Sequence, residues 1–328
     1  MSKVLVTGGA GFIGSAFTRL AVKQGYKVVV VDKLTYAGDL ARLEEVKGKY
    51  KFYKADICDQ KAVADVCKKE KPEAIINFAA ETHVDRSILD AGVFLKTNIF
   101  GTQVLLDVSR KYKIKKLIHI STDEVFGDIK KGKFTESSPL KPNSPYAASK
   151  AAADLLIKSY VRTYNFPAII VRPSNNYGPW QYPEKFIPVI IYKAMKNESV
   201  PVYAKGTNVR EWLYVDDCAR GILLALSKAR LGEVYNIGSG QEKTNIEVAK
   251  SILSALARPH SLIKHVQDRP GHDLRYALDS SKIKKLGWSN QINFKAGIGL
   301  TLDWHKKNSV WLFNKAKYLK GYWQKVYK

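Results

Sequence analysis

Short apolar runs recur along the first half of the chain, and between them lie segments whose apolar residues repeat at helical spacing. The apolar runs cover Lys3–Val6, Val28–Val31, Lys51–Tyr53, Ala74–Phe78, Lys116–Ile120 and Ala168–Val171. The helical segments include Ser15–Val22, Lys61–Lys69, Thr97–Tyr112 and a helix that begins at Tyr146. Strands that are apolar throughout are buried on both faces, as in parallel sheets. The alternation therefore predicts an α/β fold with a doubly wound, parallel Rossmann-type sheet.

The second half of the chain has a looser pattern. Short strands at Pro201–Tyr203, Trp212–Val215 and Val234–Ile237 mix with helices. We expect a smaller second domain there. The predicted division is 1–172 for the domain of the large sheet and 173–328 mainly for the smaller domain and a basic tail, with some later segments returning to the large sheet.

Three glycines, Gly8, Gly11 and Gly14, occupy the turn between the first predicted strand and the first predicted helix. A side chain at these positions would keep a dinucleotide pyrophosphate away from the N–H groups at the start of the helix. The second strand ends in Asp32, whose carboxylate can accept hydrogen bonds from an adenosine ribose and would repel a 2′-phosphate. The sequence therefore predicts an NAD-binding domain, and NAD is favoured over NADP although Lys33 directly follows Asp32.

The composition is that of a soluble globular protein, except that the net charge is strongly positive. Apolar residues make up 45% of the 328 positions, no apolar run is long enough to span a membrane, and the start resembles no secretory signal. The three cysteines form no CxxC pair, which favours a reduced cytoplasmic protein without disulfides or a metal site. The net charge is +24, yet the lysines are spread out and no nucleic-acid-binding motif accompanies them. We therefore expect no nucleic acid and no membrane as partner, and attribute the charge to a basic proteome or to a field that attracts an anionic substrate.

The densest cluster of positive charge lies in the tail, Lys315–Lys328, where lysines alternate with tyrosine and tryptophan. A basic amphipathic tail can bind a membrane surface or a partner protein. A C-terminal segment docked on the body of the protein is the favoured prediction.

A tyrosine and a lysine four residues apart, Tyr146 and Lys150, lie on one face of a predicted helix. A phenol, with a pKa of about 10, is a poor base at neutral pH, but a neighbouring ammonium and the positive nicotinamide of NAD⁺ favour the phenolate. The pair is therefore a candidate for taking a proton from a substrate hydroxyl. Thr122, at the end of the fifth strand, would orient a sugar oxygen beside Tyr146.

Two neighbouring carboxyls, Asp123 and Glu124, follow Thr122 at the carboxyl end of the fifth strand, where open parallel sheets bind their ligands. Such pairs are commonly solvated or cap a helix. Here the pair would share a cleft with a hydride acceptor, and oxidation of a sugar C4 hydroxyl to a ketone acidifies the C5 proton. One carboxylate can then remove that proton while a protonated carboxyl gives its proton to the departing C6 hydroxyl. This work requires environments that separate the two pKa values.

Nine stretches resemble the extended short-chain dehydrogenase/reductases and, within them, the dTDP-glucose 4,6-dehydratases. They run from Val4 to about Trp288 and read TGGAGFIGSAF, VDKLTYAGDL, AAETHVDRSI, STDEVFGD, PNSPYAASKAAADLL, SNNYGPWQYPEKFIP, PVYAKGTNVREWLYVDD, YNIGSGQEKTN and DRPGHDLRYALD. The resemblance implies conversion of dTDP-glucose to dTDP-4-keto-6-deoxyglucose, as in deoxysugar and rhamnose biosynthesis, with NAD retained as a catalyst. It also implies a homodimer that pairs through the helices beginning near Thr97 and Tyr146.

The resemblance further implies a role for each matching residue. Tyr146 takes the C4 hydroxyl proton as hydride passes to NAD⁺, Glu124 removes the C5 proton, and Asp123 protonates the leaving C6 hydroxyl before the hydride returns to C6. The expected catalytic residues are Thr122, Asp123, Glu124, Tyr146 and Lys150. The expected cofactor-binding residues are Gly8, Gly11, Phe12, Ile13, Gly14, Asp32, Lys33, Leu34, Thr35, Asp56, Ile57, Ala79, Ala80, Thr97, Tyr146, Lys150 and Asn176. The expected substrate-binding residues are Thr82, Thr122, Asn175, Lys185, Phe186, Pro201, Tyr203, Arg210, Asn245, Arg269 and His272.

Some positions keep an alternative. Arg210 suits a diphosphate, because a guanidinium pairs with phosphate oxygens at two points, but it would equally form a salt bridge that closes one domain on the other. Thr82 stands where serine is commoner in the family, and Phe126 stands where tyrosine is commoner. Neither change removes chemistry, although Thr82 would narrow the sugar pocket.

Other functions share this fold. A dehydratase acting on UDP- or CDP-glucose is the nearest alternative, because the residues that touch the base are harder to assign than those that touch the sugar. A sugar-nucleotide 4-epimerase keeps Tyr146 and Lys150 but needs no Asp–Glu pair, and a UDP-glucuronate decarboxylase lacks the acid at Asp123. An inactive binding module would need none of these residues. Asp123 therefore favours dehydration.

Overall fold

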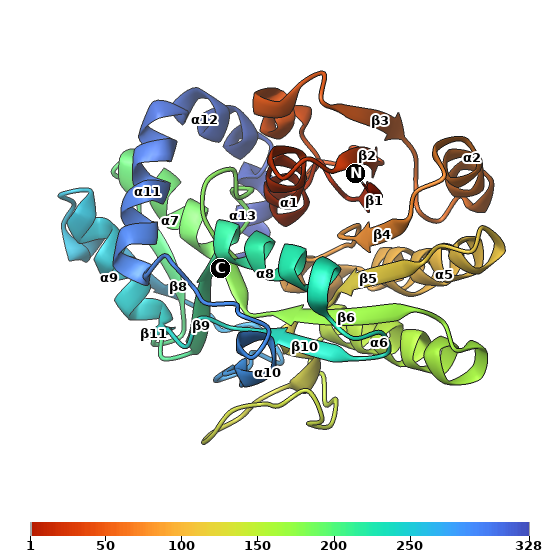
Figure 1. The fold of residues 1–328 in the computed structure, drawn as a ribbon. Coiled ribbons are helices and arrows are strands. Elements are labelled where there is room, and N and C mark those ends of the chain that lie inside the picture. The colour runs from red at the N-terminus through yellow and green to blue at the C-terminus, as the bar shows by residue number, and fades with distance from the viewer. Residues whose placement is uncertain (1, 328) are drawn as a thin grey trace.

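A seven-stranded parallel sheet forms the centre of the protein, in a computed structural model that describes residues 2–327 (Figure 1). Its order is β10-β6-β5-β4-β1-β2-β3, and every neighbouring pair is parallel. The strands are β1 (Lys3–Thr7), β2 (Lys27–Asp32), β3 (Tyr50–Lys54), β4 (Ala74–Asn77), β5 (Lys116–Ile120), β6 (Ala168–Pro173) and β10 (Val234–Ile237). The direction of winding reverses beside β1, which defines a doubly wound sheet. The predicted fold class is confirmed.

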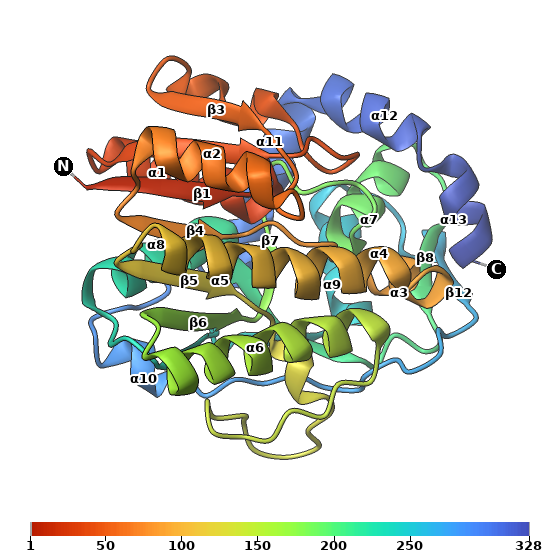
Figure 2. The same cartoon turned by 90° about the vertical axis from the view of Figure 1, so that its right-hand side faces the viewer.

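Helices cover both faces of this sheet because its strands are apolar on both sides. Val4 and Val6 of β1 lie in a cluster with α1 and α8, whereas Leu5 lies in a second cluster with α2, α5 and α6. Figure 2 looks onto the second face, where α5 and α6 run side by side. The helices are α1 (Phe12–Lys23), α2 (Gln60–Glu70), α5 (Gly101–Lys111), α6 (Pro145–Tyr164) and α8 (Val215–Lys228).

The helix predicted from Thr97 begins before that residue and changes from α-helical to π-helical hydrogen bonding and back. α4 (Gly92–Phe94) leads directly into a π-helical stretch, Leu95–Phe100, and then into α5. The Asp90 carboxylate accepts a hydrogen bond from the Gly92 N–H at 2.9 Å and so fixes a start that the prediction missed. Stretches of π-helix are rare and often occur at functional sites, and this one carries Thr97.

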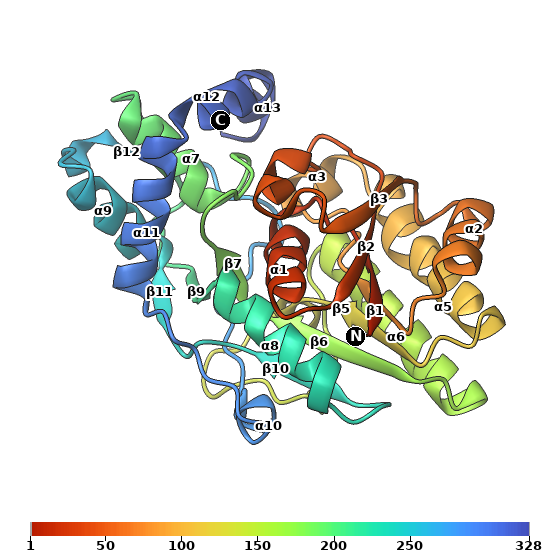
Figure 3. The same ribbon diagram turned by 45° about the horizontal axis from the view of Figure 1, so that its top comes forward.

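The second lobe is built on two small sheets beside the large one (Figure 3). One contains β7 (Asn175–Tyr177), β9 (Val209–Tyr214) and β11 (Glu242–Thr244), and the other contains β8 (Val200–Tyr203) and β12 (Ile263–Val266). An apolar cluster of its own joins them to α7 (Phe186–Met195), α9 (Asn245–Ala255) and α11 (Phe294–Lys307). Short helical segments complete the chain: η1 (Leu40–Val46), α3 (Val84–Leu89), η3 (Asp123–Phe126), η4 (His260–Leu262) and α10 (Ser281–Lys284). All three short strands predicted in this half are present, and one of them, β10, returns to the large sheet.

The C-terminal segment forms α12 (Ser309–Lys317) and α13 (Lys320–Val326), which pack on the second lobe. Leu312 and Trp323, one from each helix, are buried in its apolar cluster. The favoured prediction of a docked tail is thereby confirmed. Over residues 2–327, no helix has the length and apolar character that crossing a membrane requires.

Candidate active site

Two adjoining cavities form one cleft between the large sheet and the second lobe. The first, about 260 Å³, is lined by the glycine turn, the end of β5 and the start of α6. The second, about 160 Å³, is lined mainly by residues of the second lobe. Both cavities touch Thr82, Glu124, Asn175 and Lys185, so they are continuous. The cleft lies at the carboxyl ends of the parallel strands, as the sequence predicted.

The backbone around the glycine turn leaves no room for side chains. A dinucleotide can therefore approach the main chain closely there. Gly8 has a φ of +66°, and a Cβ there would lie 2.5 Å from the Ala79 nitrogen. A Cβ at Gly14 would collide with the Gly8 carbonyl oxygen. Gly11 begins α1 without a side-chain cap, so the first N–H groups of a 12-residue helix face the cavity edge without a competing side chain. This is the arrangement that binds a pyrophosphate.

Asp32 is held firmly at the end of β2. Its two carboxylate oxygens accept hydrogen bonds from the Ala10 N–H at 2.9 Å and the Leu34 N–H at 2.8 Å, and burial raises its pKa. Lys33 turns to Asp56, with 2.7 Å between its Nζ and the nearer carboxylate oxygen. Asp32 and the Lys33–Asp56 pair thus lie together at or just after the ends of β2 and β3.

The structure brings about half of the expected cofactor-binding residues into the first cavity and places the others around it. Those lining the cavity are Gly8, Gly11, Phe12, Ile13, Gly14, Ala80, Tyr146, Lys150 and Asn176. Those beyond its lining lie at or just after the ends of β2, β3 and β4, except for one on the π-helical stretch: Asp32, Lys33, Leu34, Thr35, Asp56, Ile57, Ala79 and Thr97.

The carboxyl pair sits on a short, capped turn. The Thr122 hydroxyl accepts a hydrogen bond from the Glu124 N–H at 3.3 Å, which caps η3, and donates one to Asp123 Oδ1 at 3.2 Å. Asp123 is 1% exposed, and burial, followed by the charges of Glu124 and Glu211, raises its pKa well above the usual range. Burial also raises the pKa of Glu124, but Arg269 and Arg210 oppose this shift. Asp123 is therefore the carboxyl that holds its proton more firmly.

Tyr146 and Lys150 both line the first cavity. Burial, followed by the charge of Glu124, raises the pKa of Tyr146, while a hydrogen bond with Thr122 opposes the shift. The Nζ of Lys150 lies 2.7 Å from the Ile120 carbonyl oxygen and 3.2 Å from His119 Nε2, and burial lowers the pKa of Lys150 to about 8. The protein alone therefore keeps Tyr146 a neutral phenol, and the positive nicotinamide remains the charge that favours its ionisation.

A buried polar chain behind Lys150 escaped the sequence analysis. The Thr7 hydroxyl donates to Asn77 Oδ1 at 2.7 Å, and Asn77 Nδ2 lies 3.1 Å from His119 Nδ1. His119 Nε2 in turn lies 3.2 Å from Lys150 Nζ, so Asn77 and His119 connect Thr7 to Lys150. Burial keeps the pKa of His119 well below its usual value. This chain fixes the Lys150 amine through contacts that cross three strands, and no local motif signals it.

The expected substrate-binding residues converge on the second cavity. All of them line it except Thr122, which lines the first: Thr82, Asn175, Lys185, Phe186, Pro201, Tyr203, Arg210, Asn245, Arg269 and His272. Lys185 Nζ donates to the Thr82 carbonyl oxygen at 3.0 Å, and burial lowers the pKa of Lys185. Burial, followed by the charges of Arg269 and Arg210, lowers the pKa of His272 to about 4.

Arg210 carries a buried charge without a carboxylate partner among the described residues. Its guanidinium donates to the carbonyl oxygens of Val209 at 2.8 Å and Asp273 at 2.9 Å, and it lies 4.3 Å from the centre of the Tyr276 ring. The domain-closing salt bridge considered for Arg210 is absent from residues 2–327. Its positive charge is thus available to an anionic ligand.

Unsatisfied buried atoms mark the cleft as a ligand site. Asp123 Oδ2, Glu124 Oε2, Asn175 Oδ1 and Arg269 Nε are all buried without a hydrogen-bond partner in the described structure. Buried polar atoms normally have partners, and a polar ligand would supply them. Glu184, which the sequence analysis did not select, lines both cavities and is fixed by Arg86 at 2.8 Å.

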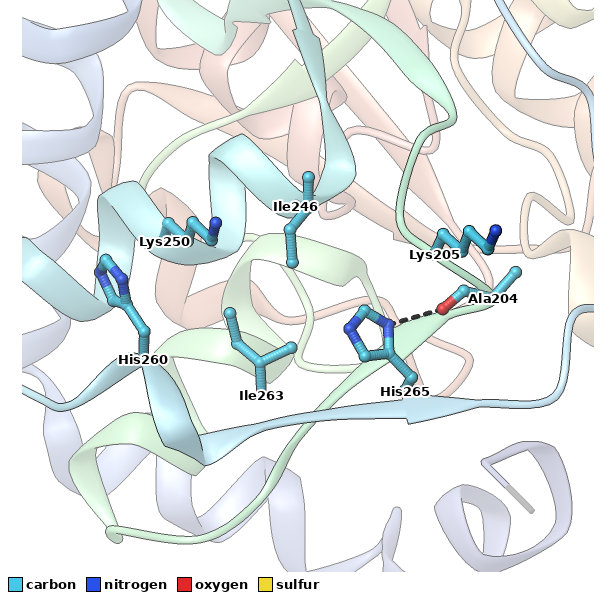
Figure 4. Close-up of a pocket in the computed structure, with 7 residues that line it drawn as sticks. All are labelled: Ala204, Lys205, Ile246, Lys250, His260, Ile263 and His265. Carbon is cyan, nitrogen blue, oxygen red and sulfur yellow. Dashed lines mark hydrogen bonds between the residues drawn. The ribbon is translucent and has the colours of Figure 1, made fainter.

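A separate hollow of about 440 Å³ lies on the second lobe (Figure 4). Exposed lysines and histidines surround Ile246 and Ile263, and His265 Nδ1 lies 2.6 Å from the Ala204 carbonyl oxygen. None of its seven lining residues is a carboxyl or lines the cleft. This hollow is therefore separate from the cleft and has no carboxyl pair in its lining.

Comparison with known proteins agrees with this site. Residues 5–301 match the family model described as GDP-mannose 4,6 dehydratase. A dTDP-glucose 4,6-dehydratase of Streptomyces niveus is 47% identical over 318 residues, which is 94% of each chain. The crystal structure of DesIV, a dTDP-glucose 4,6-dehydratase from Streptomyces venezuelae with NAD and TYD bound, superposes with a TM-score of 0.92 at 46% identity, covering 94% of this chain and 98% of that one. A UDP-glucose 4-epimerase of Thermus thermophilus in complex with NAD gives a TM-score of 0.88 at 30% identity, covering 93% and 99%. The chain belongs to the dTDP-glucose 4,6-dehydratase family.

Proposed function

We propose that the protein converts dTDP-glucose to dTDP-4-keto-6-deoxyglucose, with NAD as a retained cofactor. The observation that carries this proposal is the carboxyl pair: Asp123 and Glu124 each present an unsatisfied buried oxygen in the same cavity as Tyr146 and Lys150. Elimination of water needs one carboxyl that donates a proton and another that accepts one. The relatives that are 45–47% identical over nearly the whole chain carry the same activity in their names.

The first task of the protein is to take a proton from the sugar C4 hydroxyl. Tyr146 accepts this proton once it is ionised, and Thr122 holds the oxygen between itself and Tyr146. Lys150, fixed by His119 and the Ile120 carbonyl, binds the nicotinamide ribose. NAD, when bound, accepts the hydride from C4 and returns it to C6, so the overall reaction is redox-neutral.

The second task is the elimination itself. Glu124, as the carboxylate, removes the C5 proton that the C4 ketone has acidified. Asp123, as the carboxylic acid, gives its proton to the C6 oxygen, which leaves as water. Burial raises the pKa of Asp123 and so favours its protonated form, whereas Arg269 opposes the rise in the pKa of Glu124 and Arg210 opposes it in both carboxyls.

The basic residues of the second cavity bind the diphosphate. Arg210 provides a planar pair of donors and Lys185 a second charge beside the sugar, and the Asn175 amide completes the set. The unpaired state of Arg210 supports this role over a structural salt bridge.

The most direct test compares three substrates with the purified, NAD-loaded protein. We expect dTDP-glucose to give the alkali-induced absorbance of a 4-keto product without added reductant, and UDP- and CDP-glucose to give much less. Faster turnover of UDP- or CDP-glucose than of dTDP-glucose would identify that nucleotide sugar as the substrate instead. Formation of dTDP-galactose without a keto product would show that the protein is an epimerase. If none of the three nucleotide sugars is converted, the proposal that the protein is an enzyme is wrong.

We also propose that the protein is a homodimer. Apolar side chains stand exposed along α3, the stretch Gly92–Lys111 and α6, which contact one another: Leu89, Val93, Leu95, Phe100, Leu155 and Tyr164. Exposed apolar side chains on neighbouring helices are typical of an interface between subunits. A second copy of the same helices would cover these side chains in a two-helix to two-helix contact.

Solution mass tests this interface. Leu155 is 57% exposed, and Leu155→Glu would place a charge in the contact. The wild type should have twice the 36.8 kDa chain mass in light scattering, and the variant should approach the mass of one chain. Leu300→Glu, at a residue of α11 in the second lobe that is 47% exposed, serves as the control. A monomeric wild type contradicts the proposal.

We further propose that the protein works in the reducing cytoplasm. Cys58, Cys67 and Cys218 are free thiols in the structure, which supports a compartment without disulfide formation. Burial raises the pKa of Cys67 to about 11 and that of Cys218 to about 12, so both thiols are poor nucleophiles at neutral pH.

A further inference from the structure

The C-terminal strap, defined here as Ser309–Tyr327, crosses from the second lobe to the cofactor side of the cleft. Trp311 Nε1 donates to Asp39 Oδ2 at 2.9 Å, and Lys315 Nζ lies 2.8 Å from the same oxygen. The Arg42 guanidinium lies 5.7 Å from the centre of the Trp311 ring. Asp39 and Arg42 belong to the segment that follows β2, so α12 is tied to the half of the protein that carries the glycine turn.

The next helix, α13, contacts residues that line the substrate cavity. The Tyr322 hydroxyl lies 3.3 Å from His83 Nδ1. Arg86 is stacked between two rings, 4.6 Å from the centre of Tyr322 and 4.1 Å from that of Tyr36, and it pairs with Glu184 at 2.8 Å. His83 and Glu184 both line the second cavity. The strap is thus connected to the wall of the cleft on both of its helices.

The strap ends inside the cleft. Tyr327 lines the second cavity, and its ring lies 5.6 Å from that of Tyr203. On its other side, the Tyr203 ring meets His272 edge-on at 5.8 Å. The Tyr203 hydroxyl oxygen lies 3.3 Å from Asp85 Oδ2 and 3.5 Å from the Val326 carbonyl oxygen, so its one proton lies between the cavity wall and the end of the strap. The three rings form a partly apolar wall beside the guanidinium of Arg269, which pairs with Asp85 at 3.3 Å.

We propose that Tyr327 is a substrate-binding residue whose ring packs against the nucleoside diphosphate end of the substrate, and that the strap holds it there. The inference rests on the proposed function for the identity of the ligand. The strap lies wholly beyond residues 5–301, the part that the family model matches, so the family pattern does not include this residue. An aromatic ring beside a cationic group suits a ligand with a flat base and a charged diphosphate.

If the strap had only a structural role, the expected effect of removing the Tyr327 ring would be different. Leu312, Ala316, Leu319 and Trp323 are buried in the apolar cluster of the second lobe, and the partly buried Tyr327 also packs against that cluster. If the strap only completes that cluster, removal of the Tyr327 ring leaves ligand affinity unchanged. Ligand affinity therefore distinguishes a substrate-binding role of Tyr327 from a purely structural one.

The experiment measures binding of dTDP to the NAD-loaded, full-length protein by calorimetry, and steady-state kinetics with dTDP-glucose. Tyr327→Ala should weaken dTDP binding about 2- to 10-fold, the range that packed aromatic rings contribute, and raise KM by the same factor with kcat unchanged. Tyr327→Phe retains the ring and should bind dTDP as the wild type does. Tyr318→Ala removes a tyrosine of the same strap that is 84% exposed, and should change neither quantity.

The melting temperature of each variant is measured in parallel, so that a folding defect is recognised. Unchanged dTDP affinity in Tyr327→Ala overturns the inference. An equal loss of affinity in Tyr318→Ala also overturns it, because the effect would then belong to the strap in general. Wild-type protein that binds dTDP but converts no dTDP-glucose contradicts the proposed function alone, and the dTDP comparison still decides the role of Tyr327.

Discussion

A carboxyl group that is buried beside a second carboxyl keeps its proton at a pH where an exposed one would lose it. Asp123 is in this position, and its partner Glu124 is ionised more easily because two arginines face it. The surroundings of two residues adjacent in sequence thus act differently on their pKa values. Sequence reasoning identified the pair from its place at a strand end, but only the structure shows which of the two is better insulated from water.

Replacement of Asp123 by asparagine should separate oxidation from elimination. Asp123→Asn retains the size and the hydrogen bond with Thr122 but has no acidic proton, so we expect water elimination to slow by roughly 10²–10⁴. In a single turnover, absorbance of reduced NAD should accumulate before the keto product forms. In Tyr146→Phe, by contrast, no reduced NAD should appear. Elimination at the wild-type rate in Asp123→Asn would show that another group is the acid.

The same substitution should stabilise the protein in a pH-dependent way. The pKa of Asp123 is higher in the folded than in the unfolded state, so wild-type stability falls as the pH rises above the unfolded value of about 4. Asparagine carries no such penalty. The melting temperature of Asp123→Asn should match that of the wild type near pH 4 and exceed it increasingly towards pH 8. A difference that is constant with pH would contradict the raised pKa.

Several residues of the cleft were beyond sequence reasoning for a physical reason. His119 lies in the apolar run of β5, where a histidine carries no local signal, and its partners Asn77 and Lys150 lie on other elements. Tyr327 enters the cavity only because the tail folds back over the cleft. Such contacts arise from tertiary packing, whereas the glycine turn and the Tyr146–Lys150 spacing are local patterns.

At the scale of elements, prediction was most accurate where burial is uniform. The strands of the large sheet are apolar on both faces, and their positions agree with the structure to within one or two residues. The helix expected from Thr97 was wrong at its start because an Asx turn at Asp90, rather than apolar spacing, determines where it begins. The small strands β7 and β11 are only three residues long, so no alternating pattern can develop in them.

The N-terminus of α6 connects helix stability to catalysis. The Ser144 hydroxyl accepts a hydrogen bond from the Ala147 N–H at 3.1 Å, with Pro145 at the first helical position and Tyr146 directly after it. Ser144→Ala should lower the free energy of unfolding by about 1 kcal/mol and also reduce kcat, because the first turn carries Tyr146. Denaturant unfolding and turnover are measured on the same preparation.

A serine on the same helix provides the control. Ser159 is exposed and donates only to the Leu156 carbonyl, so Ser159→Ala should leave both quantities nearly unchanged. Equal effects of the two substitutions would mean that the cap has no special part in placing Tyr146.

At the scale of the whole molecule, a net charge of +24 acts on a substrate that carries a diphosphate. The charge is spread over the surface, so its effect reaches the cleft through solvent and is sensitive to salt. The buried cations Arg210 and Arg269 are shielded from salt by comparison. Long-range attraction and local binding can therefore be distinguished.

Raising the ionic strength should weaken capture of the substrate. From about 0.01 to 0.15 M salt, the screening length falls from about 30 to 8 Å, and we expect kcat/KM for dTDP-glucose to fall at least about twofold. Sucrose at matched osmolality should have no comparable effect. A kcat/KM that is independent of salt would mean that the positive charge serves another purpose.

The pairing of β10 with β6 also has a consequence for folding during synthesis on the ribosome. The edge of the large sheet is formed by residues 234–237, and the helix that shields one of its faces spans 215–228. A nascent chain that has emerged only as far as β6 therefore exposes the unpaired backbone of that strand and the apolar surface beside it. Until residue 237 has left the ribosome, this partial sheet presents an open edge of the kind that pairs with other chains.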